Sequence, residues 1–445
     1  MSNTVKHEQD PGLRVPSLSS PEMRRILASS FLGSAIEFYD FILYATAASL
    51  VFNKIFFTNL TPGVAIFASF ATLAVGYLAR PLGGIVFGHF GDKIGRKGVL
   101  ITSMAMMGGA STLIGLLPPT AQVGMLAPIA LIILRVVQGL AVGGEWGGAM
   151  LMALEHAPKE RRGFAASFAN MGGPAGAVLA TLAVSAVSLL PNEQFLAWGW
   201  RIPFILSIAL VGIGLVIRLK VTESPLFLSL EQKAEERKTP IREVLTRYPK
   251  SVVRGTLVGM SSYTVQGLMT VWAISFVVDD LGMDRTSVLN IKAIGAALTV
   301  VGIWFAARYS DKYGRRPVMM VGILAGALLA LPIMFMLELG QLWIFAIALF
   351  IANGIIQASI FGPFGAFTAE LFPTRIRYTG ASLVYQLSST VGAGFTPMIV
   401  AGLVLVAGGK LWLVGVVWVA TFIIAALAMR GMKEGKDADL EAQDI

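Results

Sequence analysis

The stretch GHFGDKIGRK at residues 88–97 returns in altered form as ARYSDKYGRR at residues 307–316. Their aspartates, Asp92 and Asp311, lie 219 residues apart. Each copy follows a long apolar run, so each is expected in the polar connection that follows a helix able to cross a membrane. A loop that recurs halfway along the chain predicts two related halves.

A second pair of segments repeats at nearly the same offset. Glu155 and Glu370 are 215 residues apart, as are Pro158 and Pro373, and basic residues follow each proline. Two independent motifs at almost one offset make chance a poor explanation. Many transporters build a binding site at the bilayer midplane between repeats of this kind.

The composition indicates that most of the surface faces lipid. Hydrophobic residues make up 55% and charged residues 14%, with a mean hydropathy of +0.72, whereas ordinary soluble domains carry about 25% charged residues. The chain has no cysteine and three scattered histidines, which excludes disulfides and thiolate metal sites. It also lacks a phosphate-binding Gly-x4-Gly-Lys loop. These absences argue against an enzyme and against ATP-driven pumping.

Twelve apolar runs follow one another along the chain. Almost all are long enough to cross the hydrocarbon core as a helix, and a β-barrel would instead show alternating strands of about ten residues. We therefore predict an all-α membrane protein with twelve spans in two six-helix halves. The runs cover residues 26–52, 62–87, 99–117, 125–152, 164–190, 202–217, 255–278, 289–307, 318–337, 341–369, 379–407 and 411–429.

The connections divide the chain into five parts. The longest one, residues 218–254, separates the spans six and six, and its charged stretch at 231–238 favours a helix. No removable signal peptide is expected in the polar N-terminal stretch. The predicted parts are an N-terminal tail (1–25), a first half (26–217), a linker (218–254), a second half (255–430) and a C-terminal tail (431–445).

The distribution of basic residues predicts the orientation. If both termini are cytoplasmic, 28 of the 35 Lys and Arg residues lie in cytoplasmic tails and loops, which is the excess that cytoplasmic connections usually carry. The net charge of +9 then reflects membrane topology, and no nucleic-acid partner is expected. Five basic residues fall in the outer connections: Lys54, Arg201, Arg285, Lys292 and Lys410.

These motifs carry a resemblance. The loop at 88–97 and its second copy resemble the signature loop of the major facilitator superfamily, and RVVQG at 135–139 resembles its second motif. Three other segments are similar to the metabolite–proton symporter branch, which transports shikimate, 2-oxoglutarate, citrate, aromatic acids and proline or betaine. They are EFYDF at 37–41, GGEWGG at 143–148 and ELFPTRIRYTG at 370–380. The stretch WGWRIPF at 198–204 is most similar to the shikimate members.

The charged residues inside the apolar runs are the first candidates for function. A charge at membrane depth costs roughly 2.5–3.5 kcal/mol on insertion scales, so such residues usually face a cavity. All those well inside a run belong to the first half, which places the proton chemistry there and leaves neutral and aromatic groups to the second half. They are Glu37, Asp40, Arg80, Arg135 and Glu145.

Glu37 and Asp40 are predicted to couple a proton to transport. They are three residues apart and share a helix face, where two nearby carboxylates cannot both ionise at low cost. Arg135 supplies a counter-charge, and the resemblance also implies an acid in span one that faces an arginine in span four. A proton on the acid would release Arg135 to hold a substrate carboxylate. The alternative is a structural pair that joins spans one and four.

Substrate contacts are expected from both halves. Trp146 lies eleven residues after Arg135, on the same helical stripe, and Gln138 lies on a neighbouring stripe. Each polar or aromatic candidate has an alternative role in helix–helix packing. The candidate substrate-binding residues are Arg135, Gln138, Trp146, Tyr39, Tyr44, Tyr263, Gln266, Asn353, Gln357, Tyr385 and Gln386.

The repeated loops are candidates for gating. The resemblance implies that their aspartates and arginines form ion pairs that hold one conformation and break in the other. The alternative is that they only anchor the protein at the membrane surface. The candidate gating residues are Asp92, Arg96, Asp311, Arg315, Glu155 and Glu370.

Together these inferences predict a proton-coupled importer of a small organic acid that works by alternating access. Shikimate, an aromatic acid, or a di- or tricarboxylate fits this class. The alternative is a facilitative or Na⁺-coupled carrier of the same solute or of a zwitterion such as proline or betaine. We expect no cofactor and no metal, a monomer in the inner membrane with both termini cytoplasmic, and the proton gradient as the energy source.

Overall fold

The computed structural model describes residues 20–94, 96–143, 146–155, 157–220, 240–373 and 376–436. Throughout these segments the regular elements are helices. The helix expected at 231–238 in the linker lies outside the described residues, as do most of the N-terminal tail and the end of the C-terminal tail.

The first half begins with a helix whose start is set by local capping. The Ser20 side chain accepts a hydrogen bond from the Met23 amide, and Pro21 occupies the first turn, so α1 starts five residues before the apolar run. The helices of this half are α1 (Pro21–Leu50), α2 (Phe52–Ile55), α3 (Pro62–Ile94), α4 (Arg96–Leu116), α5 (Thr120–Val123), α6 (Leu126–Val142), α7 (Trp146–Glu155), α8 (Arg162–Ser188), α9 (Asn192–Gln194) and α10 (Arg201–Lys220).

The second half follows the same plan. Its helices are α12 (Pro240–Arg247), α13 (Pro249–Val265), α14 (Ala273–Ser275), α15 (Arg285–Tyr313), α16 (Arg315–Glu338), α17 (Leu342–Phe350), α18 (Ala358–Glu370), α19 (Arg377–Ser389), α20 (Thr396–Val406) and α21 (Trp412–Arg430). Several of them are joined by π-helical segments, which are η4 (Gln266–Trp272), η5 (Phe276–Asp280), η6 (Ile351–Gln357) and η8 (Thr390–Phe395).

The spans coincide with the twelve predicted apolar runs. In the described part of the chain, nine helices are long and apolar enough to cross a membrane, and Asn192–Gly199 with Arg201–Val216 forms one more span bent by 40°. The shorter apolar helices Ile101–Leu116 and Leu126–Val142 occupy the third and fourth predicted runs. The protein is therefore a multi-pass membrane protein with the predicted all-α fold.

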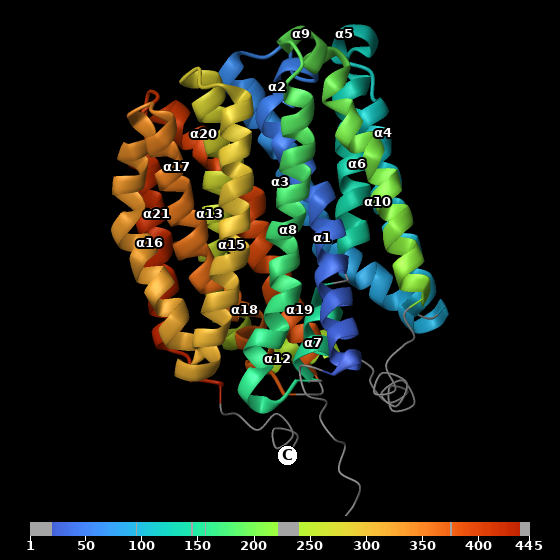
Figure 1. Ribbon diagram of the computed structural model, residues 1–445, viewed down its shortest axis with the longest axis vertical. Coiled ribbons are helices and arrows are strands. Elements are labelled where there is room, and N and C mark those ends of the chain that lie inside the picture. The colour runs from blue at the N-terminus through green and yellow to red at the C-terminus, as the bar shows by residue number, and fades with distance from the viewer. Residues whose placement is uncertain are drawn as a thin grey trace, which may run out of the picture.

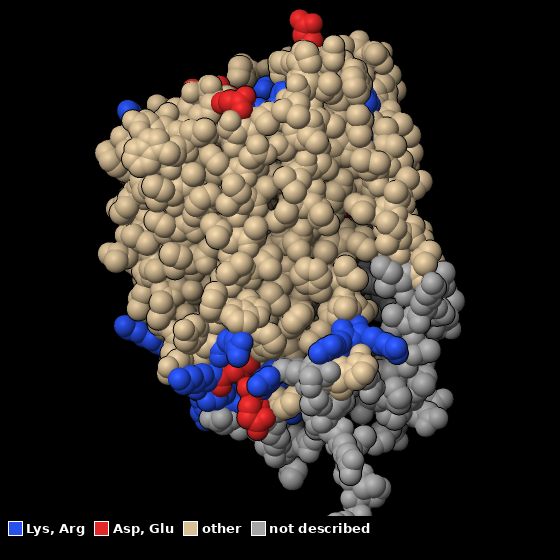
Figure 2. All heavy atoms as spheres, in the orientation of Figure 1, with Lys and Arg blue, Asp and Glu red and all other residues tan. Residues whose placement is uncertain are grey.

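The two halves stand side by side, and α8 and α15 pack against each other where they meet (Figure 1). The described chain starts and ends at the same end of the molecule. Lys and Arg side chains gather at that end, while a broad zone almost free of charge covers the middle (Figure 2). We call this end, around Arg161, Arg308 and Lys312, the basic face, and the end around Lys54 and Arg285 the opposite face.

The repeated loop at 307–316 has a structural requirement for glycine. Gly314 separates α15 from α16 with a φ of 103°, a backbone conformation that residues with a Cβ rarely adopt. The turn places the N-terminus of α16 beside Asp311, so the loop motif begins the next helix and positions its charged residues.

Glycine also sets how closely α3 and α6 approach. A Cβ on Gly139 would overlap the carbonyl oxygen of Gly76, which is backbone and cannot rotate away. The RVVQG motif therefore ends in a residue without a side chain because the facing helix occupies that space.

We predict that Gly139→Ala destabilises the folded protein by about 1–3 kcal/mol, the usual cost of overpacking a filled core. Gly109→Ala on α4 is the matched control, because a Cβ there meets nothing within 4 Å. Thermal unfolding of the purified variants in detergent checks this: the midpoint should fall for Gly139→Ala, whereas it should not fall for Gly109→Ala, because alanine favours a helix more than glycine does. Equal midpoints would contradict the packing argument.

Candidate functional site

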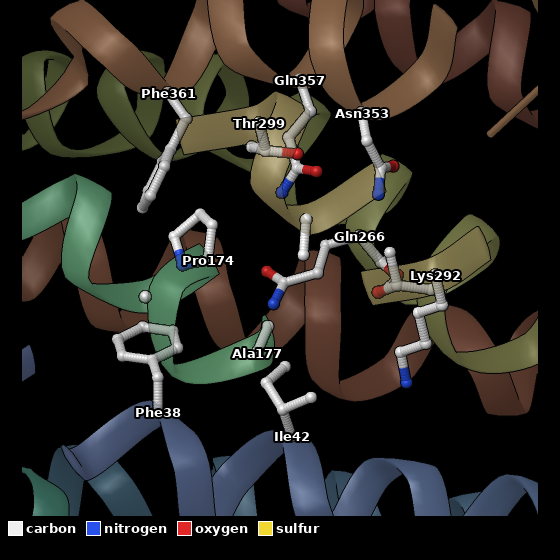
Figure 3. A pocket seen from close by; sticks show the side chains of 13 residues that line it. Phe38, Ile42, Pro174, Ala177, Gln266, Lys292, Thr299, Asn353, Gln357 and Phe361 are labelled. Carbon is white, nitrogen blue, oxygen red and sulfur yellow. Dashed lines mark hydrogen bonds between the residues drawn. The ribbon is translucent and has the colours of Figure 1, made fainter. Parts of the chain in front are cut away.

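A cavity of about 30 Å³ lies between the two halves. It has room for roughly two water molecules. Phe38 and Ile42 of α1 and Pro174 of α8 line it from the first half, opposite polar groups of the second half (Figure 3). The wall from the first half is apolar, and the hydrogen-bonding groups come from the second.

The polar wall is built largely from π-helical segments. Gln266 begins η4, and Asn353 and Gln357 lie in η6; their amide side chains point into the cavity in Figure 3. π-Helical turns occur often at functional sites because they re-aim side chains. All three of these glutamine and asparagine residues were predicted to bind substrate, and the structure brings them together.

Lys292 is the cavity residue that the sequence prediction misplaced. It was counted with the outer connections and expected near the outer end of the run 289–307, but α15 begins at Arg285, so Lys292 lies two turns inside the helix. Its side chain is 2% exposed and lines the cavity, and its Nζ donates a hydrogen bond to the Thr46 hydroxyl of α1 at 2.7 Å. The second half therefore contributes a buried cation as well as neutral groups. This corrects the expectation that the second half supplies only neutral and aromatic groups.

Asp40 lies on the other side of α1 from the cavity. Phe38 and Ile42 face the cavity one turn apart, and Asp40 between them points toward α4 and α10. The Ser207 hydroxyl of α10 donates to its carboxylate at 2.5 Å, and Ser111 of α4 also bonds to it. Asp40 is buried, so these two hydroxyls replace the water that a carboxylate would otherwise bind.

Arg135 is connected to Asp40 through two polar side chains. Its Nη1 donates to the Gln138 side-chain oxygen at 3.1 Å, and the Gln138 amide donates to the Ser111 hydroxyl at 2.7 Å. The guanidinium also lies over the rings of Phe41 and Tyr44, 4.3 and 4.0 Å from their centroids. Within the described residues, no direct ion pair joins Asp40 to Arg135, so the predicted pairing is mediated by Ser111 and Gln138.

A second charged cluster extends from α1 to the second half. The Arg80 guanidinium of α3 lies 3.7 Å from the ring centroid of Phe41 and 4.3 Å from that of Tyr77. Tyr385 of α19 is close enough to Glu37 and Arg80 to interact electrostatically with both. Glu37 is therefore near Tyr385 of the second half, whereas Asp40 bonds to hydroxyls within the first half.

Tyrosines connect this cluster to the cavity. The Tyr263 ring packs edge-on against Tyr385, with centroids 5.8 Å apart, and against Phe361, a cavity residue, at 5.5 Å. These predicted substrate-binding tyrosines thus lie between the Arg80 cluster and the cavity.

The other predicted substrate residues lie elsewhere. The Tyr39 hydroxyl donates to the Pro203 carbonyl, and that of Tyr44 donates to Thr72. The Gln386 amide donates to the Gly143 carbonyl at 3.1 Å and so joins the two halves. The side chain of Trp146, like Glu145, lies outside the described residues.

On the basic face, the second copy of the loop binds the first half directly. The Asp311 carboxylate accepts hydrogen bonds from the backbone amides of Gly163 at 2.9 Å and Phe164 at 2.8 Å. Arg315 forms ion pairs with two acids: its Nη1 lies 2.5 Å from the Asp311 carboxylate, and its Nε lies 3.1 Å from the Glu370 carboxylate. This cluster brings together three of the predicted gating residues.

The remaining gating candidates are only partly described. Glu155 of the first half lies 3.7 Å from Arg377 of the second, so the acid of the Glu-x-x-Pro motif also reaches across the interface. The side chains of Asp92 and Arg96 lie outside the described residues.

Contacts on the opposite face also join the halves. Lys54 Nζ lies 2.6 Å from Asp279, and Arg285 donates to the Ser188 carbonyl at 2.9 Å. The Ser185 hydroxyl donates to Asn290 at 2.6 Å. Polar contacts therefore bridge the halves at both ends of the molecule in this conformation. Among the described residues, no group of three or more His, Asp or Glu side chains is placed to hold a metal ion.

Comparison with known proteins identifies the family. Residues 30–397 and 255–438 match the Major Facilitator Superfamily model. The Shikimate transporter of Escherichia coli is 39% identical over 426 residues, covering 95% of this chain and 97% of the relative. An Inner membrane metabolite transport protein of the same organism is 40% identical over 408 residues, covering 90% and 91%.

The fold is also similar to that of solved transporters of this superfamily. The xylose transporter of Escherichia coli, solved in a partially occluded inward-open conformation, superimposes with a TM-score of 0.72 over 95% of this chain and 100% of its own, at 18% identity. Together with the twelve spans and the repeated loops, these matches show that the chain belongs to the major facilitator superfamily and is a transporter, not an enzyme.

Proposed function

We propose that this protein is a proton-coupled symporter that imports a small organic acid across the inner membrane by alternating access. The proposal rests mainly on one observation. Asp40 is buried beside a network that leads through Ser111 and Gln138 to Arg135, in the helix that also lines the cavity between the halves. The relatives named as shikimate and metabolite transporters support the substrate class.

The network offers a route by which protonation changes a distant cation. Asp40 accepts from two hydroxyls, while Nε and Nη2 of Arg135 have no hydrogen-bond partner in the described structure. A proton on Asp40 removes a negative charge from the surroundings of Arg135 and turns one carboxylate oxygen into a donor. Ser111 can then accept a hydrogen bond from Asp40 instead of donating one, and a rearrangement that continues through Gln138 alters what Arg135 can bind.

The orientation and the transport cycle follow from the two faces. The basic face is the cytoplasmic one, because cytoplasmic loops are enriched in Lys and Arg. Contacts join the halves at both faces, so opening toward either side breaks one set and keeps the other. This is the requirement for alternating access between two rocking halves.

The driving force depends on the charge carried with the substrate. A membrane potential of 100 mV is worth ~2.3 kcal/mol per charge, and one pH unit is worth ~1.4 kcal/mol. A neutral solute moved with one proton could reach about 500-fold accumulation from both terms together. A monoanion moved with one proton carries no net charge and reaches only about tenfold per pH unit.

Uptake into proteoliposomes tests the function. The purified protein is supplied with shikimate, protocatechuate, citrate, 2-oxoglutarate or betaine under an inward proton gradient at fixed sodium. We expect one of the acids to accumulate and a protonophore to abolish its accumulation. Uptake that only equilibrates would indicate a facilitator, uptake that follows a sodium gradient would indicate sodium coupling, and preferred uptake of betaine would indicate a carrier of zwitterions.

A further inference from the structure

We propose that Lys292 is the residue that binds the carboxylate of the transported substrate, so that the cavity between the halves selects for organic anions. This inference rests on the proposed function and names a residue that the motifs of the chain do not mark. It adds a substrate-binding cation in the second half to the charges of the first.

Lys292 has unused hydrogen-bonding capacity. An ammonium group donates up to three hydrogen bonds, and the one that the described structure provides goes to Thr46. Thr46 uses its own hydroxyl hydrogen to bond to the Ile42 carbonyl at 2.7 Å, so its oxygen is free to accept from Lys292. No carboxylate pairs with Lys292 anywhere in the part of the chain that the structure describes.

A buried ammonium with one neutral partner is costly in a membrane protein. Lys and Arg inside spans usually pair with an acid or face a water-filled pathway, and a lysine near the end of a span can extend to the interface. Lys292 has no acid partner among the described residues: it is 2% exposed, lines the cavity and is directed toward α1, as Figure 3 shows. A ligand with a negative charge would supply the missing partner.

The surrounding cavity indicates what else the ligand carries. Gln266, Asn353 and Gln357 present amide groups that both donate and accept hydrogen bonds, which suits hydroxyl groups. Across from them, Phe38 and Pro174 offer an apolar surface for one face of a ring. The lining suits a small carboxylic acid with hydroxyl groups. In this conformation the cavity holds only about two water molecules, so such a ligand enters once the halves move apart.

The contact between Lys292 and Thr46 also joins the two halves, since α15 belongs to the second and α1 to the first. A carboxylate that takes over the ammonium competes with Thr46 for it. Substrate binding would thereby replace a contact between the halves with a contact to the ligand.

Binding of an acid and its neutral ester to Lys292→Met tests the inference, because methionine keeps the length of the side chain and removes the charge. Shikimate and its methyl ester are the first probes, or the best-bound acid of the uptake panel and its ester. We expect Lys292→Met to bind the acid about 10- to 100-fold more weakly, the range for losing one charged hydrogen bond, and to bind the ester as the wild type does. Lys292→Arg should recover part of the affinity for the acid.

Two controls make the result specific. Lys410→Met removes an exposed lysine on the opposite face and should bind the acid normally. Thr46→Val removes the protein partner of Lys292 but keeps the charge, so it should bind the acid at least as tightly as the wild type.

Acid binding by Lys292→Met that equals the wild type would overturn the inference. If that variant does not fold, the wild-type comparison decides: equal affinity for the acid and its ester would also overturn it. Failure of the proposed function is a separate result, because wild-type protein would then show no proton-driven uptake of any acid, whatever Lys292 binds.

Discussion

Replacing Asp40 with Asn is expected to abolish accumulation driven by a pH gradient while substrate exchange across the membrane continues. The asparagine keeps the size of the side chain and can still accept a hydrogen bond from Ser207, which is 2.5 Å away in the wild type. It cannot take up a proton, so the substrate step and the proton step become independent. Uptake of labelled substrate into proteoliposomes, with and without substrate inside, separates the two activities.

Two comparisons show whether the effect belongs to this carboxylate. Asp280→Asn removes an exposed acid near the opposite face and should leave accumulation unchanged. Glu37→Gln tests the other predicted coupling acid. If Asp40→Asn accumulates substrate like the wild type under the same gradient while Glu37→Gln does not, Glu37 is the coupling acid and Asp40 has a structural role.

Replacing Asp311 with Asn is expected to favour opening of the basic face. The wild-type carboxylate accepts two backbone amides of α8 and pairs with Arg315. Losing hydrogen bonds to a charged group costs about 1.5–3 kcal/mol each, so the population open on this side should rise about tenfold or more. Because the chain has no cysteine, a single introduced cysteine can report the change.

Ala166→Cys is a suitable reporter, since Ala166 is buried on α8 against Gly365 of the second half. A membrane-permeant thiol reagent should label it faster in the Asp311→Asn background. Ser49→Cys reports the other side, because Ser49 bonds to the Val271 carbonyl near the opposite face, and its labelling should slow. Glu243→Gln, in a surface pair with Arg247, is the control. Unchanged labelling at both reporters would mean that the loop motif anchors the protein and does not gate it.

The sequence predicts the fold well because each membrane helix can be recognised from its own residues. A span is recognised from about twenty apolar residues, whatever its neighbours are, and the repeated loops divide the chain into halves without any knowledge of packing. The ends of the helices are harder to predict, because they depend on capping side chains. Ser20 starts α1 before its apolar run, and α15 starts at Arg285, also before its run.

The site is predicted less completely because it depends on which faces of different helices meet. Asp311, Arg315 and Glu370 come together as the repeat suggests. Ser111 and Ser207 could not be singled out, because serines are common in membrane helices and only the packing of α4 and α10 against α1 brings them to Asp40.

Lys292 shows how one boundary changes an interpretation. With the span starting at residue 289 it appears to be an interfacial lysine, whereas with α15 starting at Arg285 it lies two turns deep. The sequence feature that indicates this position is a lysine inside an apolar run, which is buried in the protein unless its side chain can reach water.

A symporter moves a proton and an organic acid together, and proton movement evoked by substrate measures this directly. Proteoliposomes with no imposed gradient receive the acid that the wild type accumulates, and the pH of a weakly buffered external medium is recorded. We expect a transient alkalinisation outside the vesicles that a protonophore removes and that Asp40→Asn does not show. Substrate entry by the wild type without any external pH change would contradict proton symport.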